Sequence, residues 1–235
     1  MYKRLEYFEN MTFVNLTEKA YYILEEAIVT LELKPGQSYS EKELSSFINI
    51  GRTPVREAIK KLEQTRLVEI IPRSGITILP IRLEEALLQM EVRRLLEKLI
   101  MLRATKFATA KEREHLLELA GRYEIATKNK DAVEAIRIDD EFNFFIADCA
   151  RNVYAAGALK PLQPSSRRIY FQRYYVDEEM TKNINYGHIG LMRAIASGST
   201  DEVTKYLDKL FDYLKDLVVK SFNSMVLDKE LLDSI

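Results

Sequence analysis

The stretch from Gly51 to Leu62 constrains the fold of this chain most strongly, because it combines an apolar face with a basic face. Apolar residues recur in it at helical spacing, at Val55, Ala58, Ile59 and Leu62. This spacing predicts a short helix that is packed from one side. Thr53 is a suitable N-cap, and Pro54 suits the first helical position. We therefore expect a helix that begins after Thr53 and leaves its charged side accessible.

The basic face of this expected helix consists of Arg52, Arg56 and Lys60, which follow one another at intervals of four residues. Two guanidinium groups and the positive end of the helix dipole would then favour a phosphate group or a guanine edge. A surface helix with ordinary solvated charge is the alternative interpretation.

The neighbouring segments favour the first interpretation. An amphipathic pattern over residues 14–31 predicts a helix, a turn follows at 33–36, and Ser40 can cap a short helix over 41–48. Downstream, two β-rich runs at 67–71 and 76–79 flank a hairpin signal. The order helix, short helix, basic helix and hairpin is typical of a winged helix-turn-helix. Residues 1–12 have no strong pattern and predict a loose arm.

The second part of the chain has a different composition, with few glycines and with leucine, alanine and charged residues at helical spacing. We expect helices at 82–107, 110–128, 131–150, 153–178, 179–197 and 199–226. The fold class predicted for the 235 residues is therefore mainly α, with a winged helix-turn-helix domain at 1–80 and an all-α bundle at 81–235. A short linker is expected around Pro80-Ile81-Arg82.

Charge and composition limit the function classes. The formal net charge is −1, yet residues 33–80 contain eight Lys or Arg and five Glu, so positive charge is concentrated around the basic helix. No apolar run approaches the length of a membrane span, and the first residues do not form a secretory leader, so we expect a cytoplasmic protein without membrane contact. Cys149 is the single cysteine and is expected to be a buried, inert thiol.

The first 80 residues resemble the GntR family of bacterial transcriptional regulators. The resemblance rests on Leu-Lys-Pro-Gly at 33–36, Ser-Glu-x-Glu-Leu at 40–44, Arg-Thr-Pro-Val-Arg-Glu-Ala at 52–58, and Leu67-Val68 followed by Pro72-x-x-Gly75. Two positions depart from the family pattern, which usually has Ser or Thr where Gly51 stands and Gly where Arg66 stands. The first departure would remove a hydroxyl contact to phosphate, and the second bears on the turn before the wing.

The resemblance implies a repressor that binds a palindromic operator as a homodimer. We expect Arg52 and Arg56 to read bases, and the wing tip to enter the minor groove. For Gly75, a simple turn requirement is the alternative. The full set of expected DNA contacts is Ser40, Lys42, Arg52, Thr53, Arg56, Lys60, Arg73, Ser74 and Gly75.

The C-terminal half resembles the FadR-like (FCD) ligand-sensing domain, through Arg93-x-x-Leu96-Glu97, the Asp139 to Asn152 stretch and the His188 to Gly198 stretch. Many members of that branch hold a divalent metal with one Asp and three His. Here Asn143 stands at the first His position and the third falls near Leu210, with the helix register open by one turn. We therefore expect no firm cofactor and no tight metal site. A metal held by Asp139 and His188 remains the alternative. Without metal, these two residues would form a buried hydrogen-bonded pair or would be two separate residues on helix surfaces.

A small-molecule effector site without metal is the expectation for this bundle. Its candidate residues are Arg93, Asp139, Asn143, Tyr170, Tyr174 and His188. Arg93 could bind an effector carboxylate, or could instead form an ion pair with Glu97 one helical turn away. The chain has no nucleophile motif and no glycine-rich phosphate loop, so an enzyme that uses Asp139 and His188 is only a remote alternative.

Overall fold

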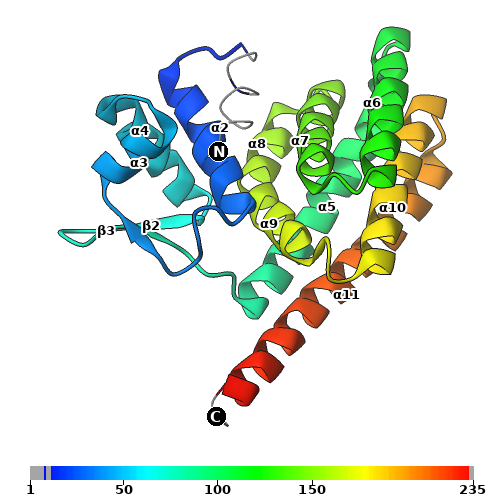
Figure 1. The fold of residues 1–235 in the computed structure, drawn as a ribbon. Helices are drawn as coiled ribbons and strands as arrows, with labels where there is room; N and C mark the ends of the chain where they lie inside the picture. The colour runs from blue at the N-terminus through cyan, green and yellow to red at the C-terminus, as the bar shows by residue number, and fades with distance from the viewer. Residues whose placement is uncertain (1–7, 9–11, 233–235) are drawn as a thin grey trace. The chain divides into compact units, whose positions relative to one another are not determined.

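The computed structural model describes Phe8 and residues 12–232, with side chains described as far as residue 222. The chain divides into two compact units, Met1–Ile81 and Arg82–Ile235, and each is described here by itself (Figure 1). The described residues are mainly helical, with one small sheet in the first unit.

The first unit has the predicted winged-helix layout. Its helices are α2 (Leu16–Val29), α3 (Glu41–Ile48) and α4 (Arg52–Gln64), and its strands are β1 (Ser38–Tyr39), β2 (Val68–Ile71) and β3 (Gly75–Ile78). The strands form an antiparallel sheet in the order β1-β3-β2, in which Val68 pairs with Ile78 and Ile71 with Gly75. The two-residue strand β1 was not predicted.

The core of this unit lies between α2 and α4. Ile23 and Leu24 from α2 and Ile59 and Leu62 from α4 are almost completely buried. The predicted start of the first helix was two residues early, because Asn15 caps α2 and leaves Val14 exposed. The expectation of a loose arm at 1–12 is wrong for one residue, because Phe8 is only 4% exposed and belongs to this core. The other arm residues, except residue 12, lie outside the described residues.

The expected N-terminus of α4 was also wrong. The helix begins at Arg52, with Gly51 as its N-cap and no side-chain cap, so Thr53 is not the capping residue. Pro54 is the third helical residue, and the first intrahelical bond joins Val55 N to Gly51 O at 3.3 Å. Proline is tolerated there because the first four N–H groups of a helix have no intrahelical acceptor.

Arg66 closes α4 in a left-handed conformation, with a φ of 57°. The turn has the hydrogen bonds of a Schellman motif, from Leu67 N to Leu62 O at 3.2 Å and from Arg66 N to Glu63 O at 3.0 Å. Glycine is the usual residue at this position, because it has no Cβ to meet the neighbouring backbone. Arg66, which stands where the family usually has glycine, therefore forms the same turn but with additional backbone strain.

Replacing Arg66 with glycine should raise the free energy of unfolding of the first unit by about 0.5–1 kcal/mol, because the left-handed strain is relieved. Arg66 is exposed, so little packing is lost. Urea unfolding measures the change. Lys61→Gly, inside the same helix, is the matched control and should lower the stability by a similar amount. A loss of stability in Arg66→Gly would contradict this explanation.

The second unit is an all-helical bundle. Its long helices are α5 (Leu83–Phe107), α6 (Ala110–Lys128), α7 (Ala132–Cys149), α10 (Glu178–Ser197) and α11 (Thr200–Leu232). Within it, α10 packs against α6 and α11, and α11 also packs against α5. Cys149 is buried, as expected, and burial raises the pKa of its thiol to about 12.

The single helix predicted over 153–178 was wrong. The structure has α8 (Val153–Leu159), the short 3-10 helix η1 (Lys160–Leu162) and α9 (Gln163–Arg173) in its place. Pro161 and Pro164 lie at the first turns of η1 and α9. Proline lacks an N–H and clashes with the preceding turn, so it interrupts a continuous helix and is accepted at the start of a new one.

Candidate nucleic-acid interface and effector cavity

The basic face of α4 is exposed, and its charges are partly engaged within the domain. The Nε and one terminal nitrogen of Arg56 donate to the two carboxylate oxygens of Glu41 on α3, at 2.9 and 2.8 Å. The hydrogen bond from Arg56 lowers the pKa of Glu41. Lys60 pairs with Glu57 at 2.8 Å. The guanidinium of Arg56 is thus already oriented for bidentate hydrogen bonding, which is also the geometry of an arginine–guanine contact. To bind a guanine, Arg56 would have to break its two hydrogen bonds to Glu41.

Three other expected DNA contacts lie at helix starts. Ser40 forms a capping box: its hydroxyl accepts from Glu43 N at 3.2 Å, and its backbone N–H donates to Glu43 Oε2 at 2.7 Å. The hydroxyl also donates to this carboxylate, at 2.7 Å. This hydroxyl is already used within α3, so a phosphate would have to compete with Glu43 for it. Lys42 and Thr53 are exposed in the first turns of α3 and α4.

The wing turn runs from Ile71 to Ser74, where Ser74 N donates to Ile71 O at 3.0 Å. Arg73 has a φ of 67°, which the third residue of a type II turn requires. Gly75 has a φ of 104°, and a Cβ there would lie 2.7 Å from Tyr39 O. The close pairing of β1 with β3 therefore accounts for Gly75, whereas Arg73 and Ser74 are exposed at the tip.

The bundle contains a small, partly open cavity with a free volume of about 40 Å³, which we call the effector cavity. Five of the six candidate effector residues line it: Arg93, Asp139, Asn143, Tyr170 and His188. Tyr174 lies elsewhere. It packs edge-on against Tyr170, with ring centroids 5.5 Å apart, and faces a separate hollow.

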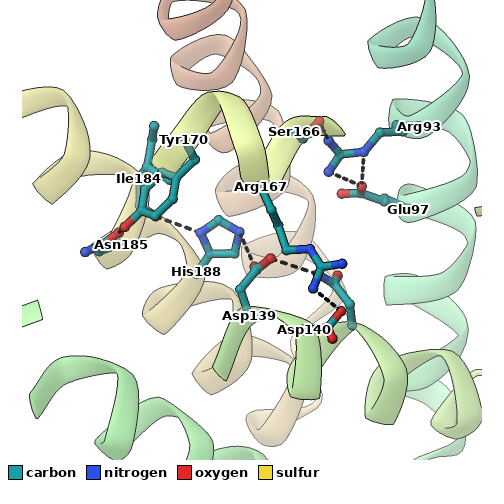
Figure 2. A network of polar contacts seen from close by, with 11 residues as sticks. Arg93, Glu97, Asp139, Asp140, Ser166, Arg167, Tyr170, Ile184, Asn185 and His188 are labelled. Atoms are coloured by element: carbon teal, nitrogen blue, oxygen red, sulfur yellow. Dashed lines mark hydrogen bonds and ion pairs between the residues drawn. The ribbon is translucent and has the colours of Figure 1, made fainter. Parts of the chain in front are cut away.

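A polar network centred on His188 occupies one side of the effector cavity (Figure 2). Its Nε2 lies 3.2 Å from Asp139 Oδ1, and its Nδ1 lies 2.9 Å from Ile184 O. The other Asp139 oxygen accepts a 3.1 Å hydrogen bond from Asn143 Nδ2. The Asp139 and His188 side chains are therefore in contact, at the distance of an ion pair, and are not two separate surface residues.

Arg93 and Glu97 form the second polar group of this cavity. Two guanidinium nitrogens of Arg93 lie 2.8 and 2.6 Å from Glu97 Oε1, and a third donates to Ser166 Oγ. The intrahelical ion pair that competed with carboxylate binding is therefore present. Both side chains of this ion pair are nearly buried, which is unusual for charged residues. The Arg93 guanidinium, which we call the Arg93 fork, is therefore held in place in the lining of the cavity.

Sequence reasoning missed Ser166 and Arg167, which come from α9 and also line the cavity. Arg167 pairs with Asp140 of α7. The segment from Ser165 to Tyr175 mixes basic and aromatic residues, and this mixture is the sequence signal that could have pointed to them.

The cavity does not fit a divalent metal. Leu210 lines the same cavity as Asp139, Asn143 and His188, and so does Leu214, one helical turn later. Where a third imidazole would stand there is therefore a hydrocarbon side chain, and Asn143 offers only a weak amide oxygen. Within the described part of the chain, no group of three or more His, Cys, Asp or Glu is arranged to hold a metal ion.

Comparisons with known proteins agree with this architecture. Residues 16–78 match the family described as bacterial regulatory proteins, gntR family, and residues 89–212 match the FCD domain. The HTH-type transcriptional repressor RspR of Escherichia coli K12 is 26% identical over 159 residues, 68% of this chain and 70% of that protein. The Nta operon transcriptional regulator of Aminobacter aminovorans is 26% identical over 198 residues, 81% and 90% of the two chains.

Solved structures are similar in fold. Escherichia coli McbR/YncC superposes with a TM-score of 0.78 at 18% identity, over 89% of this chain and all of that one. A putative GntR transcriptional regulator from Rhodococcus sp. RHA1 gives 0.64 at 18% identity, over 88% and 97%. No helix in the described ranges is long and apolar enough to span a membrane.

Proposed function

This chain belongs to the GntR family of bacterial regulatory proteins and carries an FCD domain, so it is a DNA-binding transcriptional regulator rather than an enzyme. We propose that it acts as a homodimeric repressor and that its effector contains a carboxylate. Residues 1–80 would bind a palindromic operator. Residues 81–235 would dimerise and sense the effector. The single observation that carries the DNA-binding assignment is the exposed basic face of α4 beside a correctly formed wing.

Arg56 supports sequence-specific reading because its guanidinium is already oriented by Glu41. In the major groove it would donate two hydrogen bonds to guanine O6 and N7, and Arg52 one turn earlier would read a neighbouring base. Lys42, Thr53 and Ser40 would position the domain through phosphates.

Arg56→Ala should reduce the preference for the operator over a scrambled duplex by about fivefold to 150-fold for each half-site, since a bidentate arginine–guanine contact contributes about 1–3 kcal/mol of discrimination. The operator is first selected from random duplexes with the wild-type protein. Fluorescence anisotropy on both duplexes then measures the preference. Lys61→Ala is the matched control, because it removes one exposed positive charge from a different face of α4. Full discrimination in Arg56→Ala would mean that the assigned reading face is wrong.

The homodimer proposal rests on an apolar seam along α5, formed by Leu88, Val92, Leu95 and Leu99. Each of these side chains is 44–74% exposed, and their spacing of four, three and four residues places them on one helix face. Lone exposed leucines are ordinary, but a continuous stripe marks a contact surface.

A second copy of this chain is the partner that the seam fits. If two α5 helices cross antiparallel at Leu95, the exposed Glu91 of one lies near the exposed Lys98 of the other. Two-fold symmetry repeats this attraction on both sides of the axis. Such a dimer would carry two winged helix-turn-helix domains (residues 1–80 of each copy), which we call the reading heads, and each would bind one half of a palindrome.

The effector cavity supports a sensing role because it places a buried arginine fork among α5, α7, α9 and α10. A carboxylate that takes Arg93 away from Glu97 must displace α9 or the Glu97 side chain, since Ser166 holds the same guanidinium. An effector that prefers one arrangement of these helices would shift the separation of the reading heads and so change operator affinity.

A further inference from the structure

A second hollow lies where α6, α9 and α10 end or begin, and we call it the outer hollow. Its free volume is about 250 Å³, against about 40 Å³ in the effector cavity. Three lysines and three tyrosines contribute to its walls: Lys128, Lys130, Lys182, Tyr174, Tyr175 and Tyr186. It therefore offers aromatic surface together with ammonium groups.

The outer hollow has an excess of positive charge. Lys130 Nζ lies 2.9 Å from both carboxylate oxygens of Glu178, the single acidic residue in the walls. Lys128 pairs with Glu124 at 2.8 Å, outside the hollow. Lys182 makes no ion pair with any residue that the structure describes. An anionic group would be attracted to this hollow, and most strongly beside Lys182.

The hydrogen-bonded pair Tyr170–Asn185 links the lining of the effector cavity to that of the outer hollow, and we call this pair the partition. Tyr170 lines the cavity and Asn185 lines the hollow, and the Tyr170 hydroxyl donates to Asn185 Oδ1. Asn185, which is completely buried, also donates to Thr127 Oγ1 at 3.1 Å. Figure 2 shows the Tyr170–Asn185 pair beside Ile184 and His188, at the edge of the cavity network. A movement of Tyr170 away from Asn185 would join the two spaces.

The volumes call for such a junction. A space of about 40 Å³ accepts a carboxylate-sized group or ordered water, but it does not hold a metabolite. Ligand sites in proteins usually measure about 300–1,000 Å³. The two spaces together approach the lower end of that range.

We propose that the effector cavity and the outer hollow are the two halves of one site, and that its effector is an elongated dianion. One carboxylate would meet the Arg93 fork, and the second anionic group, a carboxylate or a phosphate, would meet Lys182. A guanidinium fork matches a carboxylate, whereas an ammonium group accepts either anion. This inference rests on the proposed carboxylate-sensing function and specifies the shape and charge of the effector.

Chain-matched probes test it by calorimetry on the full-length protein: acetate, hexanoate, adipate and 6-phosphonohexanoate. We expect adipate or 6-phosphonohexanoate to bind at least tenfold tighter than hexanoate, and the tighter of the two identifies the second anionic group. Lys182→Ala should remove that preference and leave hexanoate unchanged. Lys215→Ala, an exposed lysine of α11 outside the hollow, is the matched control and should change nothing.

Tyr170→Phe tests the partition, because it deletes only the hydroxyl that bonds Asn185. It should tighten the binding of the six-carbon probes several-fold and leave the binding of acetate, which needs only the cavity, unchanged.

If neither dianion binds tighter than hexanoate, or if Lys215→Ala acts like Lys182→Ala, the two-part site is wrong. The sensing function then stands if hexanoate or acetate changes operator affinity. If no probe binds, both proposals fail.

Discussion

Leu95→Glu should convert the proposed dimer into monomers and weaken operator binding about a hundredfold or more. The substitution places two carboxylates at the proposed two-fold crossing of α5, where each would face the other instead of an apolar seam. A monomer loses the second half-site contact, and linked binding commonly contributes a factor of 10² to 10⁴. Sedimentation velocity measures the mass, and fluorescence anisotropy with the selected palindrome measures the affinity.

Leu117→Glu is the matched control, because Leu117 of α6 is 52% exposed, within the range of the seam residues, and lies outside the seam. It should leave both the mass and the operator affinity unchanged. The affinity of Leu95→Glu for a single half-site should also match that of the wild type, which separates lost dimerisation from a damaged reading head. A dimer that persists in Leu95→Glu would exclude α5 as the interface.

Much of the fold could be predicted because local patterns and tertiary packing agree in this chain. The capping box at Ser40 and the apolar stripe of α4 are short-range signals, and the structure satisfies both. The failures occur where a signal was weak or could be satisfied in two ways. Strand β1 has two residues and forms only because β3 lies beside it. Pro54 is tolerated at several first-turn positions, so it did not fix the helix start.

The effector cavity could be predicted only in part. The contact between Asp139 and His188 joins residues far apart in the sequence, and it was only one of the alternatives that the family resemblance left open. The role of Ser166 and the position of Tyr174 depend on how α9 begins and ends, and the sequence had merged α9 with its neighbours into one helix. Because the helix bounds predicted at 153–178 were wrong, the sequence could not show which residues of this segment line the cavity.

Introducing histidine at both Asn143 and Leu210 should create a zinc site in a cavity that lacks one. Both positions line the same cavity as Asp139 and His188, so the double variant would present one carboxylate and three imidazoles. Zinc needs three or four such ligands, and its binding would also raise the midpoint of unfolding by mass action. We expect no tight zinc binding by the metal-stripped wild type and micromolar or tighter binding by the double variant, measured by competition with a chromophoric chelator.

The two single variants, and the double variant that also carries His188→Ala, show whether the residues that line the cavity are the zinc ligands. Asn143→His alone would provide three ligands and should bind zinc more weakly than the double variant, while Leu210→His alone keeps the weak amide of Asn143 and should do likewise. Adding His188→Ala to the double variant leaves Asp139 and two imidazoles, so zinc binding should weaken to about the level of the single variants. The lost imidazole is the one that Ile184 O orients. Tight zinc binding by the wild type that disappears in His188→Ala would show instead that Asp139, His188 and Asn143 suffice. The metal-dependent form of effector sensing would then replace the metal-free one.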